Sequence, residues 1–539
     1  MKAGYLADLK ARLASRRIDR RQFIASAVAA GVVLPAALSM TNAVLAATPK
    51  KGGRLRQGFS AGSTTETLDA LKSSGSVIEI CNNWCWGSNL TEVQPDGSIA
   101  PELAESIEAS DKARTWVFKL RKGVTFHNGK SLTPEDVIDS VNRHRGEDSA
   151  SAVASLFASI VEMRKDGDDQ VVIKLDAPNA DFPFLLSDYR LVIMASDGNG
   201  NVDTTSGNGT GPYVIDSFDP GVRSFFKRNP DYFKADRAHF DEVEHLVILD
   251  TAARQNALTT GAVDVIDAIE PKTAHLMARV KGVRIQEVTG TQNRNMVMRL
   301  DTPPYDNLDL RLALKLSAKR QELVDKIEGG HGVVGNDHHI SPAQQYYNTE
   351  LPQREYDPDK ARFHLKKAGM EGIKLELLAS KAALEGAADA AILLKESAAA
   401  AGIDITVKRT PADGFWSNVW NKPGTGFVTS YWGGRPTNDW MFTTCCVAES
   451  NWNDSAWKGT PAADRFNELI VAARSELDED KRREMYWECQ RLVHEDSGTL
   501  VWGFTNYLHG LRDNVRHPEK VAGNWTLDGA KNMERWWFA

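Results

Sequence analysis

The sequence is poor in cysteine and has no surplus of basic residues. Only five of its 539 residues are Cys, and 65 Lys and Arg against 72 Asp and Glu give a formal net charge of −7. Proteins that bind nucleic acids need a basic excess to neutralise phosphates, so this charge balance argues against a nucleic-acid partner. The cysteines show no CxxC spacing and the histidines no HxxxH spacing, and we therefore expect no metal site and no cofactor.

An odd number of cysteines leaves at least one free thiol in an oxidising compartment. The five are Cys81, Cys85, Cys445, Cys446 and Cys489. Adjacent residues, and residues four apart, are awkward partners for a disulfide, so the best internal bridge joins Cys445 or Cys446 to Cys489. The neighbouring His338 and His339 suggest a metal ligand pair, but adjacent imidazoles rarely share one ion.

The first 46 residues differ from the rest and have the pattern of an export signal. A basic segment precedes the uncharged run from Ile24 to Leu38, which is too short for an ordinary membrane-spanning helix. Asp19-Arg20-Arg21-Gln22-Phe23-Ile24 resembles the twin-arginine export motif, with Asp in place of the usual Ser or Thr. The general secretion route and an uncleaved anchor are the alternatives.

Small residues follow the apolar run, as expected for a cleavage site. Val44-Leu45-Ala46 fits the A-x-A-like pattern, so cleavage near Ala46 makes Ala47 the first mature residue. No Cys lies nearby to accept a lipid, and we therefore predict a soluble periplasmic protein. Removal of the signal, which holds seven basic and two acidic residues, moves the formal charge to about −12.

The length exceeds that at which one hydrophobic core keeps growing, which favours two or more lobes with a cleft between them. The mature chain alternates short apolar strands with amphipathic helices, a pattern typical of α/β lobes. We expect helices after the capping residues Thr133 and Asp357, and one helical apolar face from Leu310 to Ile327. Further on we expect the order strand, helix, strand, helix, strand at residues 373–378, 382–400, 403–408, 414–420 and 427–431.

Three groups of short motifs follow one another along the mature chain. The first runs from Ile99 to Ser106 (IAPELAES) and continues at Thr115 to Gly129 (TWVFKLRKGVTFHNG). The second comprises LTPEDV at 132–137, GTGPY at 209–213 and RNPDYF at 228–233. The third comprises PPYD at 303–306, RLAL at 311–314 and YDPDKA at 356–361. In this order the motifs resemble those of family 5 extracellular solute-binding proteins, the peptide, nickel and opine binders, and the resemblance covers practically all of the mature chain.

The resemblance implies an α/β periplasmic binding protein fold of two lobes joined by a hinge. Lobe I would span residues 48–290 and resume at 505–539, with an extra subdomain at about 93–208. Lobe II would span residues 291–504. Closure of the lobes would remove a bound ligand from water and strengthen each polar contact.

The stretch from Val428 to Trp440 (VTSYWGGRPTNDW) is the most informative for ligand binding. In parallel α/β sheets, ligands bind beyond the carboxyl ends of the strands, and this stretch ends a predicted strand and opens a glycine turn. Gly433 and Gly434 allow another backbone to approach closely, as in strand addition. The candidate ligand-binding residues of the second lobe are Trp416, Tyr431, Trp432, Gly433, Gly434, Arg435 and Asp439.

Arg435 departs from the resemblance, because the oligopeptide branch has an Asp at the matching position that pairs with the ligand's amino terminus. Three interpretations are open. The ligand presents an anion to Arg435, or the turn is shifted and Asp439 supplies the carboxylate, or Arg435 pairs internally with Asp439. On the first lobe, the segment around Ser76 and the nearby Trp84 or Trp86 are the expected contacts.

These observations predict a periplasmic component of an ABC importer that captures a peptide-like or opine-like solute and delivers it to a membrane permease. We expect a monomer with a small-molecule ligand and no catalytic activity. A carbohydrate or a metal chelate is the alternative cargo for the same fold. A secreted hydrolase is the competing class, and the absence of an H-E-x-x-H motif argues against its metalloprotease form.

The arginine pair of the export signal gives a first prediction. Changing Arg20 and Arg21 together to Lys should leave the precursor in the cytoplasm, because a receptor that recognises guanidinium groups does not accept Lys at both positions. Cell fractionation with immunoblotting measures this. A matched change of Arg16 and Arg17 to Lys, outside the motif, should leave export intact. An unchanged periplasmic yield of the first variant refutes the twin-arginine route.

Overall fold

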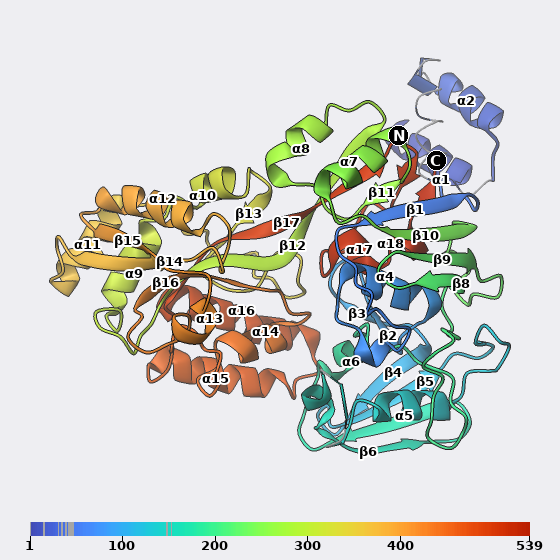
Figure 1. Cartoon of the computed structure of the whole chain (residues 1–539), viewed down its shortest axis with the longest axis horizontal. Coiled ribbons are helices and arrows are strands. Elements are labelled where there is room, and N and C mark those ends of the chain that lie inside the picture. The colour runs from blue at the N-terminus through green and yellow to red at the C-terminus, as the bar shows by residue number, and fades with distance from the viewer. Residues whose placement is uncertain are drawn as a thin grey trace.

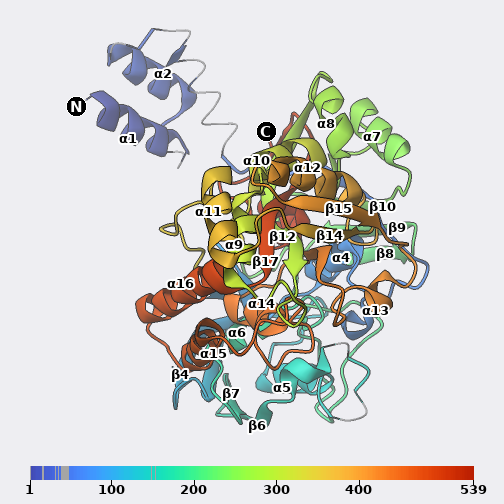
Figure 2. The ribbon, with the colours of Figure 1, turned by 90° about the vertical axis from the view of Figure 1, so that its left-hand side faces the viewer.

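A computed structural model describes residues 2–14, 17–30, 32–33, 36–37, 40, 48–146, 149–151 and 153–539. The predicted cleavage site at Val44 to Ala46 lies outside these ranges. Helices α1 (Lys2–Ala14) and α2 (Arg20–Ala29) stand apart from the two lobes (Figure 2). Asp19 caps α2 and Arg20 and Arg21 open it, so the arginine pair is exposed at a helix start. No helix in the described ranges combines the length and the apolar character needed to cross a bilayer.

The main body is a mixed α/β structure of two lobes that share one 11-stranded sheet (Figure 1). The strand order is β15-β14-β16-β12-β17-β11-β1-β10-β9-β8, and β13 also pairs with β17. The long antiparallel strands β12 (Val283–Met298) and β17 (Thr499–Arg512) run from one lobe into the other. Their register is interrupted between Thr289 and Asn293, close to the predicted boundary at residue 290. The boundary positions themselves stay predictions.

The first lobe is built around parallel strands β1, β10 and β11, with antiparallel β9 and β8 beyond β10. Its strands are β1 (Arg54–Phe59), β2 (Thr91–Val93), β3 (Ile99–Pro101), β8 (Tyr213–Asp219), β9 (Arg223–Arg228), β10 (Glu242–Val247), β11 (Val265–Ile266), β18 (Val515–Arg516) and β19 (Trp537–Phe538). Its helices are η1 (Ala70–Lys72), α4 (Val77–Trp86), α7 (Thr251–Thr260), α8 (Pro271–Met277), α17 (Thr526–Ala530) and α18 (Asn532–Arg535). The C-terminal residues therefore return to this lobe.

A separate four-stranded antiparallel sheet of order β4-β5-β7-β6 lies within the predicted extra subdomain. Its elements are β4 (Ala104–Ser110), β5 (Thr115–Leu120), α5 (Pro134–Asn142), η2 (Ala154–Phe157), β6 (Ile160–Lys165), β7 (Gln170–Leu175) and α6 (Phe182–Leu185). Strand β5 has the predicted bounds, and its alternate residues are buried. A capping box between Thr133 and Asp136 starts α5, as the sequence predicts.

The second lobe contains the predicted βαβ pattern, with β14 parallel to both β15 and β16. Its strands are β13 (Gly332–Val334), β14 (Lys374–Ala379), β15 (Asp404–Arg409) and β16 (Phe427–Trp432). Its helices are α9 (Leu308–Leu316), α10 (Arg320–Ile327), α11 (Pro358–Ala368), α12 (Ala387–Ala399), α13 (Phe415–Asn418), α14 (Asn438–Cys445), α15 (Pro461–Ala473) and α16 (Glu479–Asp496). The loop after β16 thus follows the carboxyl end of a strand that runs parallel to its neighbour β14.

Two helix predictions need correction. The apolar face from Leu310 to Ile327 belongs to two helices, α9 and α10, because the backbone leaves the helical conformation at Lys319 and the Ser317 hydroxyl donates to the carbonyl of Ala313. Helix α12 begins five residues later than predicted, since the residues after Ser380 form a turn first. Both errors arise because apolar spacing continues across a break in the backbone.

Two neutral histidines in the first lobe predict acid sensitivity. His245 on β10 forms hydrogen bonds with Gln57 and Asn82, and His509 on β17 forms them with Gln286 and Thr526, all at 2.7 to 3.0 Å inside the core. Burial lowers the pKa of each imidazole to about 3. The unfolded chain takes up these protons near pH 6.5, whereas the folded chain does not until about pH 3, so the free energy of unfolding falls as pH drops through this window.

The expected slope is up to about 1.4 kcal/mol per pH unit for each histidine. Urea unfolding at a series of pH values measures it. His245→Gln should reduce the slope because glutamine does not titrate. His275→Gln, at an exposed position on α8, is the control substitution. Equal slopes for the wild type and the His245 variant contradict this assignment.

Candidate functional site

A cavity of about 730 Å³ lies between the two lobes. One wall comes from the end of α4, strand β2, the segment 184–190 that includes the end of α6, and the segment 524–531 around α17. The other wall comes from Thr291 on β12, the segment 343–344, the loop after β16, helix α14 and the segment 450–452. A cavity of this size is typical of sites that enclose a small organic molecule.

Three of the nine predicted site residues line this cavity: Trp84, Gly434 and Arg435. The loop after β16 therefore reaches the cavity as predicted. The register of β16 against β12 explains this placement, because Trp432 pairs with Asn293 and the chain then turns toward the first lobe. The other six predicted residues lie outside the cavity lining.

Gly434 is required by the chain's own packing. A Cβ at this position would lie 1.8 Å from the Oγ1 atom of Thr291, so any other residue would displace β12. At Gly433 the nearest atom that an added Cβ would meet is the Nη1 of Arg435, at 3.7 Å. We expected this turn to let a ligand backbone approach closely. At Gly434 it is strand β12 that approaches instead.

Arg435 has no acidic partner in the part of the chain that the structure describes. Its Nη1 atom donates to the carbonyl oxygens of Gly433 at 3.0 Å and Gly434 at 3.3 Å. The side chain is half-buried at the cavity wall, and burial lowers the pKa of its guanidinium from the ordinary value. An arginine stays protonated in proteins, so the cavity contains a positive charge whose remaining donors are available to a ligand.

Asp439 does not pair with Arg435, which corrects the internal-pair interpretation. Its Oδ1 atom accepts from the Nε of Arg474 at 2.8 Å. Burial raises the pKa of Asp439 and the facing Arg474 opposes that rise. This carboxylate lies outside the cavity lining and already has a cation, so the arrangement does not favour the shifted-turn interpretation either.

The predicted aromatic residues form a cluster behind the cavity. Trp432 is 4% exposed and its indole N–H donates to Asp454 at 3.0 Å. Trp416 is 40% exposed, but it packs edge-on against Tyr431, at 5.6 Å between ring centroids, outside the cavity. Sequence spacing identified the cluster and could not tell which of its rings face the other lobe.

The rings that do line the cavity come from distant segments. They are Trp84, Phe184, Tyr189, Trp440, Trp452 and Trp525. Tyr189 and Trp525 meet edge to face at 6.0 Å, although 336 positions separate them in the sequence. Trp452 and Trp525 are 54% and 38% exposed, and exposure is not visible in a sequence.

Ser76 has a structural role. Its hydroxyl accepts from the backbone N–H of Glu79 and caps the start of α4, and it lies outside the cavity lining. Trp84, at the other end of α4, does face the cavity. Its indole N–H donates to Asn89 at 2.7 Å, and the ammonium of Lys531 lies 5.4 Å from the ring centroid, a cation–π contact.

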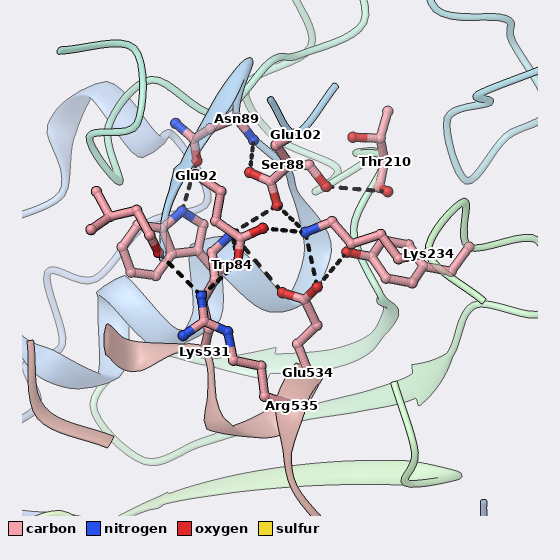
Figure 3. A network of polar contacts seen from close by, with 12 residues as sticks. Trp84, Ser88, Asn89, Glu92, Glu102, Thr210, Lys234, Lys531, Glu534 and Arg535 are labelled. Carbon is pink, nitrogen blue, oxygen red and sulfur yellow. Dashed lines mark hydrogen bonds and ion pairs between the residues drawn. The ribbon is translucent and has the colours of Figure 1, made fainter. Parts of the chain in front are cut away.

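A network of buried charges supports the first-lobe wall (Figure 3). The ammonium of Lys234 donates to the carboxylates of Glu92 at 2.6 Å, Glu102 at 2.8 Å and Glu534 at 3.0 Å. Lys531 donates to Glu102 at 2.7 Å. These three carboxylates are close enough to hold a cation, but two ammonium groups already occupy that position.

The network also fixes the charge of Glu92, which lines the cavity. Burial raises its pKa, but Lys531, Lys234 and Arg535 together outweigh burial and hold the pKa well below the usual range. Glu92 is therefore an anion that its neighbours neutralise. Arg435 also lines the cavity, but unlike Glu92 it has no ion-pair partner in the described chain.

The segment from Leu527 to Ala530 has left-handed backbone dihedrals, with φ between 53° and 68°. Such a conformation costs about 1 to 2 kcal/mol for each residue other than glycine. Asp528 compensates by accepting from the backbone of Ala522 at 2.8 Å, the indole of Trp536 at 3.0 Å and the guanidinium of Arg535 at 3.1 Å. This turn places Gly529 and Lys531 at the cavity.

The model for bacterial extracellular solute-binding proteins, family 5, matches residues 98–454, more than half of the chain. The chain belongs to this family. The dipeptide-binding protein of Escherichia coli (strain K12) is 24% identical over 450 residues, which cover 78% of this chain and 83% of that protein. The fold is thus a two-lobed binding protein, as the sequence motifs predict.

Two solved structures share the fold at low identity. HbpA2 from Haemophilus parasuis aligns with a TM-score of 0.79 and 20% identity, over 88% of this chain and 99% of that one. AgaA from A. tumefaciens R10, in complex with agropinic acid, aligns with a TM-score of 0.65 and 21% identity, over 90% of this chain and 99% of that one.

The five cysteines of this solute-binding protein are all free and buried, so the predicted bridge to Cys489 does not form. Cys445 and Cys446 lie side by side instead, with their Sγ atoms 3.2 Å apart. The residues Gly58 to Gly62 (GFSAG) have the spacing of a hydrolase nucleophile elbow. Here the Ser60 hydroxyl donates to Asp267 at 2.6 Å and lies outside the cavity lining, so this spacing marks a turn after β1.

The lobes of this solute-binding protein also touch away from the β12–β17 pair. Arg482 on α16 forms a buried ion pair with Asp181, at the start of α6, and also donates to the carbonyl of Ala473 at 3.2 Å. The backbone N–H of Ala180 donates to the carbonyl of Arg474 at 2.8 Å. Burial lowers the pKa of Arg482, but Asp181, Tyr486 and Tyr346 together outweigh burial and raise that pKa above its ordinary value, so the cation is stabilised in place.

Removing one member of this ion pair gives a prediction. Asp181→Asn should lower the free energy of unfolding by about 3 to 5 kcal/mol, because it leaves the buried charge of Arg482 without its partner. Urea unfolding measures the change. Glu488→Gln removes the partly exposed partner of the exposed Arg465 and should cost less than about 1 kcal/mol. Equal effects of the two substitutions contradict a stabilising role for the contact between the lobes.

Proposed function

We propose that this protein is the periplasmic binding component of an ABC importer, and that it captures a small peptide-like or opine-like solute bearing an anionic group. The family assignment and the cavity between the lobes support solute capture. Its relatives include a dipeptide-binding protein and a protein solved with agropinic acid, an acid by name. The captured solute would pass to a membrane permease.

The position of Arg435 is the observation that supports an anionic group on the solute. It lines the cavity, it stays charged, and it has no acidic partner in the described chain. A planar guanidinium binds a carboxylate or phosphate through two parallel hydrogen bonds, which are stronger than those to neutral acceptors. Because the cavity walls exclude part of the solvent, such a pair is stronger there than in water.

The rest of the cavity supports a solute with apolar or planar parts. Aromatic rings line both walls, with Trp84, Tyr189 and Trp525 on the first lobe and Trp440 and Trp452 on the second. Rings of this kind supply large contact areas at low entropic cost. A ligand that touches both walls would stabilise the lobes in one relative arrangement, and binding would then be measurable as added stability.

Arg435 gives the test of this proposal. The probes are libraries of di- and tripeptides, opines and oligosaccharides, screened by thermal shift with the signal-free protein. At a concentration one hundred times the dissociation constant, a true ligand adds about 2.7 kcal/mol of stability. Arg435→Ala should weaken binding of the best probe by about 2 to 5 kcal/mol in calorimetry, with little change in the thermal stability of the free protein.

Trp416→Ala is the matched control. This residue belongs to the same lobe but lies outside the cavity, so the variant should keep the wild-type affinity. Wild-type affinity in Arg435→Ala contradicts the anionic group while leaving solute capture intact. A folded protein that responds to none of the probes counts against the transport function, and consumption of a probe during the titration favours an enzyme.

A further inference from the structure

Three potential metal ligands meet in the second lobe, directly behind the cavity wall. They are His339, Cys445 and Cys446, and one ligand atom from each lies within 4.8 Å of the others. The cysteines stand at the end of α14, and the histidine follows β13, so 105 residues of chain separate the two parts. Nothing in the sequence indicates this arrangement, because neither part has the spacing of a known metal motif.

The histidine is buried, and the hydrogen-bonding group beside its ring is the thiol of Cys446. His339 is 0% exposed, and neither of its ring nitrogens makes a hydrogen bond of normal geometry in the described part of the chain. Buried polar atoms are almost always hydrogen-bonded. The neighbouring His338 also has two unsatisfied ring nitrogens, but of the two only His339 lies beside two thiols, so it is this cluster, and not the unsatisfied nitrogens alone, that indicates a missing partner. The two thiols beside it are weak hydrogen-bonding groups and strong metal ligands when deprotonated.

A carboxylate of the same region also has a free oxygen. Asp454 is 1% exposed, and its Oδ2 atom accepts from the indole of Trp432 at 3.0 Å. Its Oδ1 atom has no partner in the described chain. A carboxylate near a metal-bound histidine commonly accepts the ring's second N–H and fixes its orientation.

We propose that His339, Cys445 and Cys446 bind one zinc ion. Two thiols would lose their protons to solvent on binding, and two thiolates with a neutral imidazole balance the charge of Zn²⁺. This neutrality matters because most side chains around the site are apolar, including Ile340 and Met441, with the carboxyl group of Asp454 as a polar exception, and a net charge is costly in such surroundings. A monovalent ion such as Cu⁺ would leave one negative charge uncompensated.

The distances suit zinc after small movements. Zinc lies about 2.3 Å from sulfur and about 2.0 to 2.1 Å from nitrogen in a tetrahedral site, which places neighbouring ligands roughly 3.5 to 3.8 Å apart. The two sulfurs now lie 3.2 Å apart, and the largest separation within the set is at most 4.8 Å. At 3.2 Å the sulfurs are also well beyond the bond length of a disulfide, about 2.05 Å.

The ion would connect two segments that line the cavity. Thr443 and Thr444 precede the cysteines and face the cavity, and Gln344 follows His339 by five positions and also faces it. Zinc would therefore hold the second-lobe wall in place. The role assigned to the ion is structural, and it does not depend on the identity of the transported solute.

Cobalt(II) is the probe for this site, because tetrahedral thiolate coordination gives it intense visible and near-ultraviolet absorption bands. The complete mature protein, without the export signal, is reduced and stripped of metal with a chelator. It is then titrated first with Co²⁺ and afterwards with Zn²⁺. We expect one equivalent of Co²⁺ to produce these bands and one equivalent of Zn²⁺ to abolish them. Elemental analysis should find one zinc per chain after dialysis.

Variants assign the ligands. Cys445→Ser, Cys446→Ser and His339→Gln should each weaken zinc binding at least about tenfold, and Asp454→Asn should weaken it about 10-fold to 100-fold, because Asp454 orients the histidine. Cys489→Ser is the matched control, since Cys489 is an equally buried thiol of the same core cluster and should leave binding unchanged. If a variant fails to fold, X-ray absorption of the zinc-loaded wild type should report two sulfur and one imidazole neighbours.

Three outcomes overturn the proposal. The first is a folded, reduced wild-type protein that binds neither Co²⁺ nor Zn²⁺ at equimolar concentration. The second is zinc binding that survives the double change of Cys445 and Cys446 to Ser. The third is a Cys445–Cys446 disulfide, found by mass spectrometry in protein purified without reductant, that persists when zinc is supplied during expression.

Discussion

The pairing of β12 with β17 is the constraint on which the rest of the structure depends. These strands hydrogen-bond along most of their length and belong to both lobes. The sheet of the second lobe joins that of the first through them, and the ion pair between Asp181 and Arg482 adds a second connection. The cavity exists because these connections hold the lobes facing each other while leaving the space between them open to a solute.

The two walls of the cavity differ in whether their charged side chains have ion-pair partners. On the first lobe, buried carboxylates and ammonium groups neutralise one another, and Glu92 and Lys531 present a balanced surface. On the second lobe, Arg435 is held only by backbone carbonyls in the described chain. A half-buried charge without a counterion is unfavourable, so this position suits the anionic ligand that we propose.

The second lobe contains a further example of unsatisfied polar atoms. His339 and Asp454 both have buried atoms without hydrogen-bond partners in the described residues, and His339 lies next to the thiols of Cys445 and Cys446. In the first lobe a comparable set of carboxylates is filled by Lys234 and Lys531. The contrast between a filled and an unfilled cluster is the basis for assigning an ion to one and none to the other.

The sequence by itself determined the family, the α/β class and most of the elements. Strand β5, the capped start of α5 and the parallel set around β14 follow from spacing and capping, which act over a few residues. It also placed the turn containing Arg435 at a strand end, where ligands of such sheets bind.

Only the tertiary structure decided which side chains face the cavity and which charged side chains pair. Asp439 lies four positions from Arg435, yet its partner is Arg474, and the meeting of His339 with the two cysteines has no local signal. Pairing and exposure depend on contacts between distant segments, and a local pattern carries no information about them.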